Sequence, residues 1–581
     1  MYRQLIHRPN TSHIRQELMA LLTQAPFKTD YDLDCKAMQH RTYEQLGVLN
    51  RWAGSGSALL RDRDRLFSAL EFAAIVNPSL FHVAQVHYGV CLASIKELGN
   101  HSTHLQKVID SLDELASVCA ILITELGRGN SHLAIATRAV YEPKTEQFVI
   151  STPDKAARKI MPNVALEGVA KMGLVFAQLW CGDKNHGLFP FVVPIRSERR
   201  IFPGIHITPL PGNSALSMDY AMVHFDEVRV PRANWLGDTA TINKDAMLVD
   251  PLADISRRLV RSLVGSGNAS TSTAIGAAAV SRVCTWTALR YAVQRNTMGQ
   301  LGPRRSVLEF RSQQNLLFSA LAETYAITCL ANQLVADSQA SNVTGAASST
   351  GPMTAPWATI NRLAALTKTV AIGGAEAVIL NCRRASGAQG VLAVNRFREY
   401  EDLVVAYASA GGDNRLILLD IGCDLARRSG DGSLPSVSLP SEFGGADALR
   451  QLAKFEERRQ YERVTKGLAE CQAGDKESLP IWNPRLTAAI DLAKIYGCRV
   501  ALERLLESAR EMGENGKVVE ALATIYAINH FGACLPYETS DRALTCAFDV
   551  VLPQLDRLLD AFDLSPIMVS APMASGDYTA M

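Results

Sequence analysis

Apolar residues recur with two different periods along the chain. Up to about residue 118 they follow helical spacing, as in the segments 66–76 and 105–112, which predicts amphipathic helices. From about residue 119 to 238, short runs rich in β-branched and aromatic residues are separated by turn formers such as Pro203-Gly204. This stretch predicts a compact β-domain. Its expected strands are 133–141, 148–151, 173–179, 189–195, 205–208 and 222–230.

Helical spacing returns at about Ser256 and predicts long helices over 277–291, 310–335 and 362–384. Ser338–Pro356 is rich in Ser, Thr, Ala and Gly and predicts a flexible loop. The fold class is therefore expected to be α+β, mainly α. The expected parts are an N-terminal helical domain (1–118), a central β-domain (119–238), a helical bundle (239–428), a linker (429–446) and a C-terminal helical domain (447–581).

The composition is that of a globular protein with sizeable cores, since 48% of the 581 residues are hydrophobic and 20% are charged. Lys plus Arg number 59 and Asp plus Glu number 58, so no global field favours nucleic acid or an anionic membrane. No apolar run reaches the roughly 20 residues that a membrane-spanning helix needs. Neither nucleic acid nor a membrane is expected as a partner.

The twelve cysteines are scattered and form no C-x-x-C pair, which argues against zinc and for reduced thiols. His101 and His104 have the spacing of a metal pair, but no third ligand accompanies them, so no metal is expected. No signal peptide is recognisable at the start, and Thr579-Ala580-Met581 is not an address of the S-K-L type. A cytoplasmic location is expected.

Four segments at the joints between the predicted parts carry distinctive patterns. In the first, the glycines allow backbone N–H groups to approach an anion without a Cβ in the way. The second reads F-D-E-V-R-V-P and closes the predicted β-domain. The third and fourth lie in the predicted helical bundle. The segments are Thr124–Ser131, Phe225–Leu236, Arg290–Gly299 and Cys382–Gly390.

In this order and spacing, the four segments resemble the acyl-CoA oxidase branch of the acyl-CoA dehydrogenase superfamily. They are similar, in turn, to the family patterns T-E-[LM]-G-x-G-S, F-D-x-V-R-V-P-x-x-x-x-L, R-Y-x-x-x-R-x-x-F-G and C-R-x-A-x-G-G-x-G. The predicted helical domain after residue 446 also matches oxidases, because the shorter dehydrogenases lack it. Ala388 replaces the second glycine of the last pattern.

The resemblance implies a flavin-dependent oxidoreductase with FAD as cofactor. It further implies an acyl-CoA or carrier-bound thioester as substrate, O2 as electron acceptor or co-substrate, and a homodimer with FAD at the subunit interface. The arginine that matches Arg295 contacts the FAD pyrophosphate in relatives, and its planar guanidinium suits bidentate contact with phosphate. The cofactor-binding residues implied in this way are Thr124, Gly127, Gly129, Asn130, Arg295, Thr297, Gln313, Arg384, Gly387, Asp413 and Asn414.

The residue that removes the substrate's α-proton in relatives is missing. They place a glutamate in a T-x-E-G-[DE]-N segment, and the matching segment here, Ser409–Asn414, has Gly411 at that position. Some relatives use a base on an earlier helix, but the corresponding Gly267–Thr271 has no carboxylate either. The identity of a catalytic residue is therefore left open.

The segment beside the flavin also departs from the family. Oxidases show K-W-W-P-G-G-L-G, whereas Lys159–Leu166 reads K-I-M-P-N-V-A-L. Loss of both the aromatic residues and the glycines suggests room for something other than a straight acyl chain.

Three functions stay open at this point. The first is an oxygenase or atypical oxidase acting on a cyclic or aromatic acyl thioester in specialised metabolism, because such a substrate needs less help from a base. The second is a catalytically silent subunit that binds FAD or CoA. The third is an ordinary fatty acyl-CoA oxidase in which Glu401 or Asp402 serves as a displaced base. A general base contributes about 10²- to 10⁴-fold to such a reaction.

Overall fold

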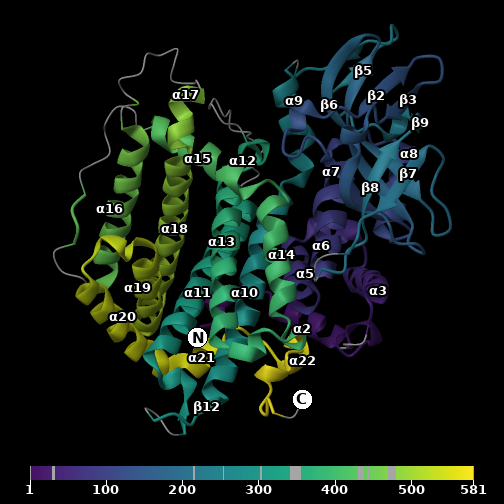
Figure 1. The fold of residues 1–581 in the computed structure, drawn as a ribbon. Coiled ribbons are helices and arrows are strands. Elements are labelled where there is room, and N and C mark those ends of the chain that lie inside the picture. The colour runs from purple at the N-terminus through teal and green to yellow at the C-terminus, as the bar shows by residue number, and fades with distance from the viewer. Residues whose placement is uncertain are drawn as a thin grey trace. The chain divides into compact units, whose positions relative to one another are not determined.

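The computed structural model groups the chain into two units, residues 20–272 (the β unit) and residues 1–19 with 273–581 (the helical unit) (Figure 1). The predicted loop Ser338–Pro356 and the predicted linker 429–446 lie mostly outside the residues that the structure describes. The described residues are 2–28, 30, 33–212, 216–252, 254–300, 304–340, 355–428, 437–440, 444–466, 468 and 479–579.

Side-chain caps set where the helices of the β unit begin. Asp34, Ser55 and Asp62 each accept a hydrogen bond from a backbone N–H in the first turn of the following helix. Pro78 starts a new helix directly after Asn77, at a position where its missing N–H costs nothing. The helices are α3 (Cys35–Ala53), α4 (Gly56–Arg61), α5 (Arg63–Val76), α6 (Pro78–Ala84), a π-helix (Gln85–Leu92), α7 (Ala93–Leu98), α8 (Thr103–Asp113) and α9 (Ile255–Ser262).

The strands of the β unit form two main sheets around one core. The larger has the order β1-β5-β2-β3-β9 with β6 paired to β5, and the smaller has the order β4-β8-β7. Both contribute buried aromatic residues to the core, such as Phe148 and Phe191 from the first and Phe225 from the second. The strands are β1 (Val118–Leu122), β2 (Arg138–Glu142), β3 (Gln147–Ser151), β4 (Lys159–Asn163), β5 (Lys171–Cys181), β6 (Lys184–Arg196), β7 (Ile205–Pro209), β8 (Tyr220–Phe225) and β9 (Val228–Pro231).

Two of the predicted strands are wrong in detail. The run 133–141 begins with a 3₁₀ turn, His132–Ala134, before β2. The run 222–230 is two strands in different sheets, because Glu227 adopts a φ of 49° between β8 and β9. A non-glycine residue in the left-handed region turns the chain sharply, so the segment 222–230 contributes a strand to each sheet.

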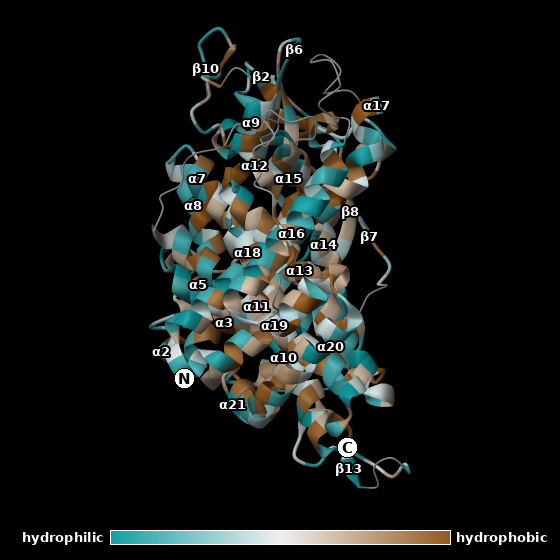
Figure 2. Cartoon of the chain, turned by 90° about the vertical axis from the view of Figure 1, so that its left-hand side faces the viewer, coloured by the Kyte–Doolittle hydropathy of each residue, from teal (hydrophilic) through white to brown (hydrophobic). Residues whose placement is uncertain are grey.

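The helical unit confirms the long helices that the spacing predicts. Hydrophilic and hydrophobic residues alternate along its helices, as Figure 2 shows for α11 and α18. The helices are α1 (Arg3–Ile6), α10 (Asn268–Gln294), α11 (Arg311–Ala340), α12 (Pro356–Ile360), α13 (Arg362–Ala385), α14 (Phe397–Ser409), α15 (Asn414–Arg428), α16 (Gly445–Thr465), α17 (Leu479–Trp482), α18 (Leu486–Glu511), α19 (Lys517–Phe531), α20 (Tyr537–Val551), α21 (Leu555–Asp560) and α22 (Pro566–Val569).

Within the described residues, α13 alone is long and apolar enough, by length and composition, to cross a bilayer. The sequence pattern had predicted no such stretch. However, 72% of this window is buried inside the fold, which is the environment of a core helix.

Candidate active site

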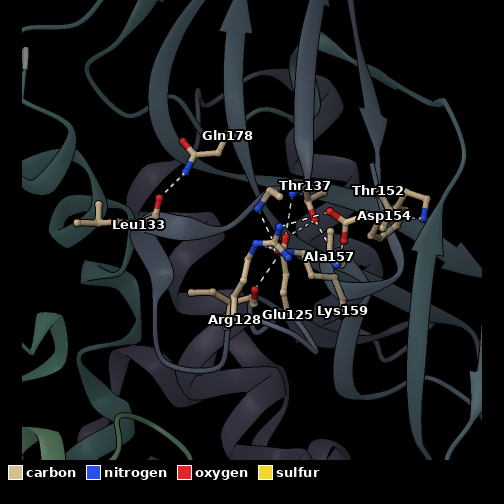
Figure 3. Close-up of polar contacts among 12 residues, drawn as sticks. Glu125, Arg128, Leu133, Thr137, Thr152, Asp154, Ala157, Lys159 and Gln178 are labelled. Atoms are coloured by element: carbon tan, nitrogen blue, oxygen red, sulfur yellow. Dashed lines mark hydrogen bonds and ion pairs between the residues drawn. The ribbon is translucent and has the colours of Figure 1, made fainter.

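The loop that follows β1 is fixed by a buried carboxylate (Figure 3). Glu125 Oε1 accepts from the backbone N (2.8 Å) and the hydroxyl (2.6 Å) of Thr137, and Oε2 accepts from Ala136 N (2.9 Å). Burial would raise the pKa of Glu125, but the charge of Lys159 and these hydrogen bonds outweigh it and hold the pKa below its usual value. An ionised carboxylate therefore holds the beginning of the loop in place.

Lys159, on β4, is the ionic partner of Glu125. Its Nζ lies 3.2 Å from Glu125 Oε1 and donates to Ile123 O at 3.0 Å, and neither charged side chain is exposed. Burial lowers the pKa of Lys159 to about 8, although Glu125 opposes the shift. The two charges satisfy each other inside the β unit.

The predicted cofactor-binding glycines in this loop serve its own geometry. The Gly127 N–H donates to Ala156 O at 2.8 Å, and the Gly129 N–H donates to Glu125 O at 3.1 Å. A Cβ at Gly127 would lie 2.5 Å from Ala156 Cβ, and Gly129 has a φ of 49°. Their amides are thus occupied within the chain, although both glycines remain exposed.

The same loop places the other two predicted contacts of the β unit at its ends. Thr124 is half-buried and its carbonyl accepts from Ile160 N at 3.0 Å, whereas Asn130 is exposed. Nearby, Gln178 on β5 donates from Nε2 to Leu133 O at 3.2 Å (Figure 3). Its buried Oε1 has no partner among the described residues. A buried amide oxygen without a donor indicates a position where a ligand can supply one.

The first part of the segment 159–166 forms β4, which the sequence pattern had not predicted as a strand. Its pairing with β8 is irregular between Ile160 and Asn163. Within this irregularity, Met161 has a φ of 64° and is 53% exposed. An exposed methionine in the left-handed region is a costly arrangement, and such strain concentrates at functional sites.

In the helical unit, Arg295 and Thr297 lie at a small hairpin after α10. Its strands are β12 (Asn296–Thr297) and β13 (Arg305–Ser306). Arg295 is exposed, and its guanidinium donates to the carbonyl of Asn296. Thr297 Oγ1 accepts from Gly299 N at 3.2 Å. An exposed guanidinium at this position can pair with a phosphate.

Two further predicted contacts have buried polar atoms that lack partners. Gln313 Oε1, in the first turn of α11, and Asn414 Oδ1, at the start of α15, are buried and have no hydrogen-bond partner among the described residues. Leaving such an atom unpaired costs about 1–3 kcal/mol. A bound polar group that donates a hydrogen bond to each of these two oxygens would remove this cost.

Gly387 ends helix α13 in the left-handed conformation, with a φ of 56° and open space where a Cβ would be. The following turn folds back, so that a Cβ at Gly390 would lie 2.4 Å from Arg383 O. Arg383 Nε in turn donates to Gly390 O at 3.2 Å. Arg384, the predicted contact, is exposed at the end of the same helix.

The loop at Gly411, where the sequence comparison with the family expects the base, has an unusual backbone. Gly411 has a φ of 67° and Gly412 a φ of 96°. A Cβ at Gly412 would lie 2.7 Å from Trp357 Cγ, so the aromatic ring of α12 covers this glycine closely. No carboxylate extends from either position. The loop is shaped by two left-handed residues, which favours glycine at both.

Lys368 on α13 holds the same loop from inside. Its fully buried Nζ donates to Gly412 O. Burial lowers the pKa of Lys368 to about 7, although Asp413 opposes the shift. A titratable amine thus lies at the backbone position next to Gly411.

Asp413 begins helix α15, because its Oδ1 accepts from the backbone N of Arg415 at 2.8 Å. The same helix positions Trp357 indirectly. Asp420 accepts from Ala355 N at 2.6 Å, directly before α12, and pairs with Arg362 at 3.0 Å. Burial raises the pKa of Asp420.

The two carboxylates considered as displaced bases are ion-paired. Glu401 contacts the guanidinium of Arg383, and Asp402 lies 3.1 Å from Arg398 Nε. Within the described ranges, no group of three or more His, Cys, Asp or Glu side chains could hold a metal ion.

The structure therefore brings the predicted contacts into separate groups. Thr124, Gly127, Gly129 and Asn130 share one loop of the β unit. Asp413 and Asn414 share the loop of the helical unit that Lys368 and Trp357 hold. The sequence analysis missed Lys368, Trp357 and the Glu125–Lys159 pair. A lone lysine inside the apolar run of α13 was the signal for the first.

Comparison with known proteins matches residues 271–425 to the family model for the acyl-CoA oxidase C-alpha1 domain. The chain is 28% identical over 378 residues to acyl-coenzyme A oxidase 2, peroxisomal, of Arabidopsis thaliana, which covers 63% of this chain and 53% of that protein. It is 31% identical over 332 residues to human peroxisomal acyl-coenzyme A oxidase 3, covering 55% and 46%. The matches thus span about half the length of these curated relatives.

Solved structures share the fold over almost the whole chain. An acyl-CoA oxidase from tomato (Lycopersicon esculentum) has a TM-score of 0.81 at 19% identity, covering 100% of this chain and 92% of that one. Acyl-CoA oxidase-2 of Caenorhabditis elegans, solved with FAD, ascaroside-CoA and ATP, has a TM-score of 0.82 at 18% identity, covering 99% and 90%. The predicted α+β, mainly α, fold is confirmed.

Proposed function

We propose that this chain is a member of the acyl-CoA oxidase branch of the acyl-CoA dehydrogenase superfamily, and that it is an FAD-dependent oxidoreductase acting on an acyl thioester with O2. Its chemistry differs from that of an ordinary oxidase because the proton-removing glutamate is absent. The observation that carries this proposal is the loop at Gly411 and Gly412, which is closed by Trp357 and Lys368 and offers no carboxylate.

The residues present fit FAD. Gln313 Oε1, Asn414 Oδ1 and Gln178 Oε1 are buried acceptors without partners in the described part of the chain, and exposed Arg295 offers a guanidinium for phosphate. When bound, FAD supplies the electron acceptor and the route of those electrons to O2. Thr124, Arg295, Gln313 and Asn414 are the side chains we expect to hold it.

The contacts of the carboxylates near the loop argue against a simple α-proton transfer to one of them. Asp413 caps α15, and Glu401 and Asp402 are in ion pairs with arginines. A carboxylate held by a guanidinium is a weaker base than a free one, since the ion pair favours its charged form. We therefore favour a substrate whose α-carbon is already acidic or enolised, such as a cyclic or aromatic acyl thioester.

Among the described residues of α13, Lys368 is the titratable side chain that contacts the backbone of this loop. A lysine with a pKa of about 7 is partly neutral at physiological pH, because burial disfavours its charged form. Its hydrogen bond to Gly412 O fixes the loop, so we assign it a positioning role.

The experiment that tests the proposal uses the purified full chain with its bound flavin, a panel of acyl-CoA esters and isotopically labelled O2. Mass spectrometry of the products separates the possibilities. Label in the organic product supports an oxygenase, and an enoyl product with peroxide supports an atypical oxidase. A flavin-containing chain that consumes no O2 with any ester would instead indicate a silent subunit, and a chain that binds no flavin would contradict the proposal.

Four points remain predictions. They are a catalytically silent subunit that binds FAD or CoA, a thioester carried by CoA or by a carrier protein, the homodimer, and the cytoplasmic location. The names of several similar proteins include the word peroxisomal, and location is best determined by imaging the tagged full chain.

A further inference from the structure

Three helices of the helical unit bring a thiol, an imidazole and a carboxylate into a line. Cys498 on α18 has its Sγ 3.4 Å from Nδ1 of His530 on α19. His530 Nε2 lies 2.7 Å from Glu323 Oε2 on α11. One ring nitrogen therefore faces the sulfur while the other faces the carboxylate. This is the arrangement in which an imidazole activates a nucleophile and a third group orients the imidazole.

The carboxylate end of this line is buried and closely fitted. The Glu323 side chain is 10% exposed and the His530 side chain 27%. Helix α13 has a glycine, Gly374, where it packs against this carboxylate. A Cβ at Gly374 would lie 2.4 Å from Glu323 Oε1, so a larger residue would clash there. A buried carboxylate that a neighbouring helix accommodates in this way is part of a specific packing arrangement.

The electrostatics favour an imidazolium. Burial alone would lower the pKa of His530, but Cys498 and Glu323 outweigh it and raise the pKa well above its usual value. The Tyr526 ring, with its centroid 4.3 Å from that of His530, adds a neutral contact from the same helix. Burial and the neighbouring Cys498 and Glu323 raise the pKa of the Tyr526 hydroxyl, so it stays protonated.

The thiol is reachable, in contrast to most cysteines described. Cys498 is partly exposed, whereas Cys91, Cys119, Cys284, Cys329, Cys382 and Cys423 are buried. A thiolate, and not a thiol, is the nucleophile, and a neighbouring cation stabilises it.

We propose that Cys498, His530 and Glu323 form a reactive-thiol site, in which Cys498 is oxidised by hydrogen peroxide to a sulfenic acid. This site shares no residue with the loop at Gly411, and its reaction needs no flavin. Its oxidant is peroxide from any source, including an oxidase reaction of the chain itself.

The Cys498 thiolate attacks one oxygen of the peroxide, an S–O bond forms and the O–O bond breaks. The sulfur loses two electrons and the peroxide gains them. Imidazolium Nδ1–H of His530 gives its proton to the departing hydroxide, which leaves as water, and Glu323 keeps its hydrogen bond to Nε2–H.

The chain offers matched internal controls. Cys534 is partly exposed like Cys498, but its Sγ donates to the Phe531 carbonyl at 3.4 Å instead of contacting an imidazole. Burial raises the pKa of Cys534, so this thiol should be the slower one. Cys546 is more exposed than either and controls for access alone.

The test treats the reduced full chain with limiting peroxide at pH 6, traps sulfenic acid with dimedone and quantifies each cysteine by peptide mass spectrometry. We expect Cys498 to be labelled about tenfold faster than Cys534 and Cys546, because its sulfur faces the imidazole of His530. Equal labelling of the three cysteines would overturn the proposal. This comparison within the unmodified chain needs no variant.

Two variants then separate the roles. His530→Gln should reduce Cys498 labelling to the rate of Cys534, and Glu323→Gln should reduce it less, since the imidazole remains. Labelling of Cys498 that is unchanged in a folded His530→Gln chain would contradict the assigned role.

Discussion

Two fully buried lysines show how differently the two units treat a charge. Lys159 in the β unit lies 3.2 Å from the carboxylate of Glu125. Lys368 in the helical unit donates only to the carbonyl of Gly412 in the contacts that are described. Burial lowers the pKa of Lys159 to about 8 and that of Lys368 to about 7. A full ionic partner thus keeps its lysine charged over a wider pH range.

The two loops are fixed by different contacts. A complete buried ion pair between Glu125 and Lys159 fixes the loop of Thr124. The loop of Gly411 carries no carboxylate at that position, and a neutralisable lysine and the Trp357 ring fix it. A charge pair thus anchors the first loop, whereas a single hydrogen bond from a lysine and the packing of an aromatic ring anchor the second.

The largest effect is expected from breaking the ion pair. Glu125→Ala leaves the Lys159 charge buried without a partner and removes the acceptor of the Thr137 and Ala136 amides. We expect a loss of about 3–5 kcal/mol in the free energy of unfolding, measured by urea denaturation.

Glu142→Ala is the matched control, because Glu142 pairs with Arg229 on the exposed surface at 2.5 Å. No measurable destabilisation is expected there. Equal effects of the two alanine variants would show that the Glu125–Lys159 pair is not special.

The next effect comes from filling the space beside Trp357. Gly412→Ala places a Cβ 2.7 Å from Trp357 Cγ at a φ of 96°, so overpacking and backbone strain add. We expect about 2–3 kcal/mol of destabilisation. Trp357→Leu should recover part of the loss in the double variant, and purely additive losses would contradict the contact.

A smaller effect concerns the pH dependence of stability. The folded pKa of Lys368 lies below its unfolded value, so between pH 7 and 10 the unfolded chain binds more protons than the folded chain. The free energy of unfolding should therefore rise with pH in this window, by up to about 1.4 kcal/mol per pH unit from this residue.

Lys368→Met removes this contribution and should flatten the pH dependence relative to the unmodified chain. Lys159 shifts in the same direction, so part of the slope should remain. A variant with the same slope as the unmodified chain would mean that Lys368 is charged throughout.

Much of the fold follows from the sequence pattern, because α10, α11 and α13 have apolar residues at helical spacing over long stretches. The break between β8 and β9 was not predicted, since it depends on one left-handed residue, Glu227, inside a segment that the strand pattern takes as continuous. The sequence motif identified the loop of Thr124 but not the role of its glutamate.

The candidate site was predictable only as far as local sequence determines it. Glu125 lies next to Thr124 in the motif, yet its function as an anchor depends on contacts with Thr137 and Lys159 across the sheet. Trp357 and Lys368 lie far from Gly411 in the sequence, and only the packing of α12 and α13 brings them to it. Cys498, His530 and Glu323 have no spacing that a motif could capture, because each comes from a different helix.

The central claim, that the proton-removing carboxylate is missing at Gly411, is tested most directly by restoring it. Gly411→Glu and Gly411→Gln carry the same strain at a φ of 67°, but only the first adds a base. Anaerobic stopped-flow absorbance would follow flavin reduction by a saturated acyl-CoA in both variants and in the unmodified chain. We predict reduction at least about tenfold faster with Gly411→Glu than with Gly411→Gln or the unmodified chain. Fast reduction in the unmodified chain, or equal rates in the two variants, would contradict the account.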